Sequence, residues 1–105
     1  MDRPTGPVYV GISEIAVPSG GATALEVAFQ DRLRAVDGWP GFAGLELLQD
    51  RRRPGRFLMI TRWASKSQFL AYMRSADHKR SHARIRTGPL GPRPNGFTDY
   101  DLVAR

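Results

Sequence analysis

The sequence contains no cysteine. This absence excludes disulfides, thiolate metal sites and thiol nucleophiles, so any metal ligand must be a histidine or a carboxylate. The sequence also lacks an apolar run near the ~18 residues that a membrane-spanning helix needs. The opening segment MDRPTGPVYV has neither the basic start nor the apolar run of a signal peptide. We therefore expect a cytoplasmic protein that does not associate with membranes.

A recognition motif for nucleic acid is absent as well, although the chain is basic. Sixteen Lys and Arg stand against ten Asp and Glu, which gives a formal net charge of +6. Nucleic-acid-binding domains usually add an aromatic platform or a recognition motif to such charge, so we expect no nucleic-acid partner. The densest basic run, Arg51, Arg52 and Arg53, falls at a predicted hairpin tip. Like charges stay solvated there, and we expect no functional role for them.

The length of 105 residues allows one hydrophobic core, because domains typically hold about 100 to 150 residues. We expect a single domain over residues 1–105. A chain of this size buries only somewhat over ~60% of its unfolded surface, and a partner subunit would add core to it. Length alone therefore favours a homodimer.

Apolar periodicity and turn residues predict six elements along the chain. The second helix is expected to begin at a Ser65 cap, with Phe69, Tyr72 and Met73 on one face, and to bend near Ser75. Proline and glycine between Thr87 and Gly96 predict a loop. The expected strands are Val8–Val17, Phe42–Gln49, Arg56–Trp63 and Phe97–Val103, and the expected helices are Ala22–Val36 and Ser65–Arg86.

This order, βαββαβ, predicts an α+β ferredoxin-like fold in which two helices cover one face of an antiparallel sheet. The first strand is apolar on both faces, since Tyr9 and Ile15 alternate with Val10 and Ile12. The face without helices then needs a cover, and we expect a second copy of the chain to pack sheet to sheet against it as a dimeric α/β barrel.

A set of motifs spans nearly the whole chain. PGFAGLELL occupies residues 40–48, and Trp63, Ser65 and Phe69 follow with the spacing W-x-S-x-x-x-F, ahead of a helix that carries His78 and His82. Together with the βαββαβ order, this pattern resembles the antibiotic biosynthesis monooxygenase family. The family consists of dimeric ferredoxin-like proteins and includes haem-degrading monooxygenases and cofactor-free oxygenases of aromatic polyketides.

The resemblance to the haem-degrading branch implies roles for three positions. His82 falls at the axial iron ligand, Tyr72 at a tryptophan position on the same helix, and Ser13 at an asparagine position on the first strand. The polyketide branch carries over only at Trp63, because Met59 and Phe69 stand where that branch has asparagine and tyrosine.

Each of these residues also has an ordinary structural explanation. Trp63 and Tyr72 have the spacing of core aromatics, and Trp63 is more readily explained as core than as a site residue. His82 can be a surface histidine on a basic helix. His78 lies one turn before it, but no third ligand is indicated for this pair, so we expect no metal site of that kind.

The sequence thus predicts a monooxygenase with a pocket between the second helix and the sheet for a flat aromatic or tetrapyrrole ligand. His82, Tyr72 and Trp63 would be catalytic, His82 and Ser13 would bind a cofactor, and Phe69 and His78 would contact the substrate. The resemblance implies that the cofactor is none or haem, and the sequence shows no flavin or nicotinamide motif. The alternative is a catalytically silent dimeric ligand-binding or structural protein of the same fold.

Overall fold

The computed structural model describes residues 8–18, 20–30, 35–83 and 93–105, with the backbone alone at residues 35, 81–83 and 93. Its strands are β1 (Tyr9–Ala16), β2 (Phe42–Gln49), β3 (Arg56–Trp63) and β4 (Arg93–Asp101). Its helices are α1 (Ala22–Gln30), the short 3₁₀ helix η1 (Ala35–Gly38), α2 (Lys66–Met73) and α3 (Ala76–Ala83).

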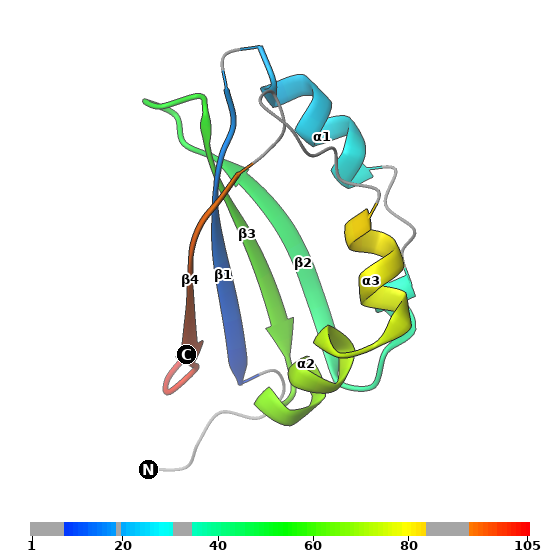
Figure 1. Cartoon of the computed structure of the whole chain (residues 1–105). Helices are drawn as coiled ribbons and strands as arrows, with labels where there is room; N and C mark the ends of the chain where they lie inside the picture. Colours follow the sequence, from blue (N-terminus) through cyan, green and yellow to red (C-terminus); the bar gives the residue numbers. More distant parts are fainter. Residues whose placement is uncertain (1–7, 19, 31–34, 84–92) are drawn as a thin grey trace.

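The four strands form one antiparallel sheet in the order β2-β3-β1-β4, and the helices lie on one side of it (Figure 1). This is the ferredoxin-like α+β arrangement that the element order predicts. The predicted hairpin is the β2–β3 pair. No helix in the described part of the chain is both long enough and apolar enough to cross a membrane.

The predicted bend near Ser75 is a complete break between α2 and α3. Ser65 caps α2 as expected, since its hydroxyl accepts from the Gln68 backbone N–H at 3.3 Å. At the other end the Ser75 hydroxyl donates to the Tyr72 carbonyl at 2.6 Å and accepts from the His78 backbone N–H at 3.1 Å. One side chain therefore ends α2 and begins α3, because it satisfies a terminal carbonyl of the first helix and a terminal N–H of the second.

Three local predictions were wrong. The helix predicted for Ala22–Val36 is α1 as far as Gln30, and Val36 is buried in η1 instead. Met73 does not share the buried face of α2, since its side chain is 40% exposed. Strand β4 begins at Arg93, within the predicted loop, because β4 is an edge strand with a bulge opposite Glu14 and Ile15. Proline is tolerated at an edge or a bulge, so Pro94 fits there.

The core consists of two clusters at opposite ends of the helix-facing side of the sheet. One cluster contains Tyr9, Val36, Trp63, Phe69 and Tyr72, and the other contains Val17, Leu25 and Phe57. Each fully buried aromatic or aliphatic side chain stabilises the fold by roughly 1.5–3 kcal/mol. The first cluster fixes α2 and the second fixes α1 on the sheet.

The opposite side of the sheet, which we call the open face, carries apolar side chains that none of the helices in the described residues covers. Since side chains alternate along a strand, residues next to the buried ones point to this side. Leu48 and Tyr100 are 45% and 52% exposed there. The apolar residues of the open face are Val10, Ile12, Leu48, Leu58, Ile60 and Tyr100.

Candidate functional site

The candidate site begins with the aromatic cluster under α2. Trp63 ends β3 with 1% of its surface exposed, and its ring centroid lies 5.9 Å from that of Phe69 and 5.7 Å from that of Tyr72. The indole N–H donates to the Thr61 hydroxyl at 2.7 Å, so its polar atom is satisfied inside the core. Trp63 therefore supports the rings around it and has no surface of its own to offer a ligand.

Between the two core clusters lies a stretch of the helix-facing side that is less covered than either end. Its residues, Ser13 on β1 and Met59 and Thr61 on β3, are half-buried, and Ser13 and Met59 are direct cross-strand partners. We call these three residues the central strip. Alternation places Ser13 on the same side as buried Tyr9, so the strand turns this predicted site residue toward the helices.

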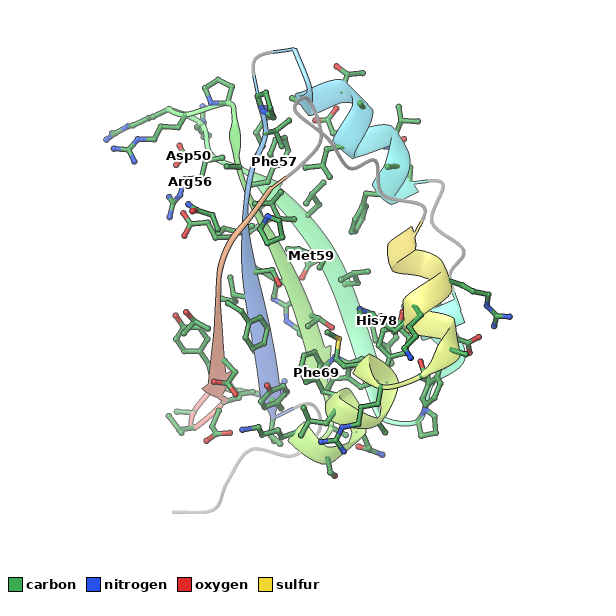
Figure 2. The ribbon with its side chains drawn as sticks, in the orientation of Figure 1. Asp50, Arg56, Phe57, Met59, Phe69 and His78 are labelled. Carbon is green, nitrogen blue, oxygen red and sulfur yellow. The ribbon has the colours of Figure 1, made fainter. Side chains whose placement is uncertain are left out.

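His78 borders this region from α3. Figure 2 shows its ring on the side of α3 that faces the sheet, toward β2 and β3. The imidazole meets Tyr72 edge-on at a centroid distance of 5.3 Å, and it is half-buried. The Trp39 indole N–H donates to Asp77 at 3.2 Å, which ties the first turn of α3 to the residues before β2. The structure therefore brings His78 against Tyr72, which belongs to the same core cluster as Phe69.

His82 belongs to α3, one turn after His78, but its side chain lies outside the described residues. The role of His82 as axial iron ligand, which the family resemblance implies, stays a prediction. Among the residues whose side chains the structure describes, no group of three or more His, Cys, Asp or Glu is placed to hold a metal ion.

A buried phenol, that of Tyr9, lies at the first residue of β1. The Tyr9 hydroxyl donates to Asp99 at 3.0 Å, and Lys66 of α2 lies 3.7 Å from the same carboxylate. Burial, followed by the hydrogen bond to Asp99 and the charges of Asp99 and Asp101, raises the pKa of Tyr9 to about 12. Near neutral pH this phenol is a donor and not a base.

Sequence reasoning missed Phe97 as a candidate. It lies on β4 opposite Ser13 and stacks on Phe69 with a centroid distance of 5.8 Å and an interplanar angle of 5°. The last strand does show an aromatic residue, but the sequence does not say to which side of the sheet it points. The pairing of β1 with β4 shows this side, because Phe97 lies opposite Ser13 and therefore points toward the helices.

These observations define a ferredoxin-like α+β protein whose helices leave the central strip of the sheet only partly covered. The sequence pattern of the antibiotic biosynthesis monooxygenase family matches residues 8–84, and the chain belongs to this family. The chain is 35% identical over 81 residues to a mycobilin-producing haem oxygenase of Mycobacterium tuberculosis, which covers 77% of this chain and 76% of that protein.

Solved structures similar to this chain include a haem degrader and an oxygenase. The haem degrader MhuD of Mycobacterium tuberculosis, with two haems bound in its active site, is 30% identical, with a TM-score of 0.76 over 92% of this chain and 97% of MhuD. SnoaB, a cofactor-independent oxygenase of Streptomyces nogalater, has a TM-score of 0.74 at 16% identity, over 95% of each chain. At that identity the similarity to SnoaB shows the fold alone.

Proposed function

We propose that this chain is a monooxygenase that binds haem between α2, α3 and the sheet and degrades it. The observation that carries the proposal is the 35% identity to a haem oxygenase over about three quarters of both chains. The likeness does not rest on a single motif, because the 30% identity to the haem-bound MhuD structure extends over 92% of this chain.

The residues around the central strip suit a flat, largely apolar ligand with a metal centre. Met59 offers a half-buried apolar surface on the helix-facing side of the sheet, and the rings of Phe69 and Tyr72 belong to the core cluster at one end of that side. Ligand sites are generally lined by apolar and aromatic side chains with a few placed polar groups. Ser13 supplies one such polar group, and neutral imidazole is a suitable ligand for iron.

Under this proposal His82 would hold the iron, and haem, when bound, would supply the redox chemistry with oxygen. Tyr72 and Phe69 orient the ligand plane and exclude water from one of its faces. Ser13 would offer its hydroxyl to the ligand as a hydrogen-bonding group from the strand side. His78 packs on Tyr72 and holds that ring in position, which makes it a positioning residue.

We further propose that two copies of the chain associate through the open face. Half-buried Ile12 and Ile60 lie at its centre and are cross-strand partners. Charged residues stand among the apolar ones in ion pairs, Arg62 with Glu46 and Arg56 with Glu14. An apolar centre with paired charges around it is the usual composition of a protein interface, and a second copy would remove the apolar centre from water.

The test is a titration of the purified protein with haem and, separately, with a hydroxylated polycyclic phenol, while oxygen uptake is recorded. The proposal predicts a shifted Soret band with haem and reductant-dependent oxygen uptake. Uptake with the phenol alone would instead identify a cofactor-free oxygenase. Binding without uptake in either case would identify a catalytically silent ligand-binding protein.

A further inference from the structure

Phe97 is a partly exposed aromatic residue on the helix-facing side of the sheet that the proposed function has not used. Its side chain is 51% exposed, although it lies on the helix-facing side of the sheet with Tyr9 and Ser13. Its stacking partner Phe69 is only 7% exposed. The Phe97 ring therefore extends from the aromatic cluster toward the surface, at the β4 edge of the same side that carries the central strip.

Gly11 fixes where this ring lies. A Cβ atom on Gly11 would stand 3.0 Å from Cε2 and Cζ of Phe97 and 3.1 Å from the methyl group of Thr61. Such separations are tighter than normal van der Waals contact, so the absence of a side chain at Gly11 lets the ring lie against β1. The edge of the Phe97 ring and the methyl group of Thr61 thus both border Gly11, and Thr61 belongs to the central strip.

The orientation of the ring is fixed as well. An interplanar angle of 5° to Phe69 means that the two rings are parallel, and Phe69 is held by Tyr9 and Trp63 at centroid distances of 5.2 and 5.9 Å. Aromatic ligands prefer offset-stacked or edge-to-face contact with such rings. A ring that is held in place before the ligand arrives loses little freedom on binding.

We propose that Phe97 is a ligand-binding residue that contacts the flat ligand of the central strip from the β4 side and thereby favours planar macrocyclic or polycyclic ligands. This inference rests on the proposed function and adds a residue to it. The contact is between the ring and the ligand plane, so it does not depend on the iron. It sets Phe97 apart from His82, whose contribution under the proposed function is to the iron alone.

The experiment compares the unaltered protein with Phe97→Leu, using haem and iron-free protoporphyrin IX as probes. Leucine keeps an apolar side chain of similar volume and removes the flat ring. Because Phe97 is half exposed, the variant is expected to fold, and circular dichroism checks this. Aromatic contacts of this kind correspond to a roughly threefold to tenfold change in affinity. We expect Phe97→Leu to weaken both probes by that factor.

Tyr100→Leu is the matched control, because Tyr100 lies on the same strand, is 52% exposed, and points to the open face. The three proteins are compared at concentrations where sedimentation gives them the same mass. Unchanged affinity for either probe in Phe97→Leu, or an equal loss in Tyr100→Leu, would overturn the assignment of Phe97. Failure of the unaltered protein to bind either probe would overturn the proposed function itself.

Discussion

The imidazole of His78 meets the ring of Tyr72 edge-on, with centroids 5.3 Å apart and planes at 75°. This contact joins α2 to α3 across the break between them. At that break the Ser75 hydroxyl donates to the Tyr72 carbonyl and accepts from the His78 backbone N–H. The direction of α3, and so the place of His82, depends on how α3 is held at its first turn. His78 and the Trp39–Asp77 hydrogen bond of 3.2 Å are two of the contacts that hold it.

The two histidines are therefore expected to respond differently to substitution. His82→Ala should abolish the shifted Soret band of the haem complex, because it removes the proposed iron ligand. His78→Ala should keep the band and lower the free energy of unfolding by about 1 kcal/mol, the usual size of an aromatic edge contact. Haem titration and urea unfolding measure the two effects. Loss of the band in His78→Ala but not in His82→Ala would identify His78, one turn earlier on α3, as the iron ligand.

The open face is expected to be the dimer interface. Ile60→Lys would place a charge at its centre, and the desolvation of an unpaired charge opposes association. Sedimentation equilibrium at micromolar concentration should give a dimer for the unaltered protein and a monomer for this variant. Val27→Lys is the control, because Val27 is 50% exposed on α1, away from that face. A monomeric unaltered protein, or equal disruption by both variants, would refute the interface.

The arginines of the β2–β3 hairpin are expected to have no part in ligand binding. Arg51, Arg52 and Arg53 are exposed, and the turn is held by Asp50, whose carboxylate accepts from the backbone N–H groups of Arg52 and Arg53 at 2.8 and 3.0 Å. The triple variant with serine at all three positions keeps those backbone bonds. It should bind haem within twofold of the unaltered protein, a limit inside the usual ±0.5 kcal/mol of surface substitutions. A larger loss would show that the hairpin tip contacts the ligand.

The hydrogen bond between Tyr9 and Asp99 predicts a pH dependence of stability on the alkaline side. The folded pKa of about 12 lies above the ordinary 10.0, so folding favours the protonated phenol. That contribution is fully present below pH 10 and is lost as the pH rises toward 12. Urea midpoints should therefore fall more steeply across this range in the unaltered protein than in Tyr9→Phe. Equal slopes would mean that Tyr9 ionises normally.

The element order and most strand limits follow from sequence periodicity, because β1, β2 and β3 alternate apolar side chains or run between clear turns. The start of β4 does not follow from it. Pro94 and Gly96 normally indicate a loop, and only the edge position and the bulge opposite Glu14 make a strand possible there.

Helix phase predicted that Phe69 and Tyr72 share the buried face of α2, whereas Ser13 was named only because the family resemblance implies it. Phe97 was not predicted, since its role depends on ring contacts with Phe69 and Gly11, which are distant in the sequence and adjacent only through strand pairing. The family resemblance implies that His82 is the ligand, which stays a prediction, whereas nothing in the sequence distinguished the surroundings of His78 from an exposed helix face.

The most direct test of the account is the visible spectrum of the haem-loaded protein after an electron donor is added in air, with catalase present to remove free peroxide. The Soret band is expected to decay with time while an open-chain tetrapyrrole replaces haem, and haem without the protein is expected to stay intact under the same conditions. A Soret band that persists unchanged on the folded, haem-bound protein would contradict the central claim that this chain degrades haem.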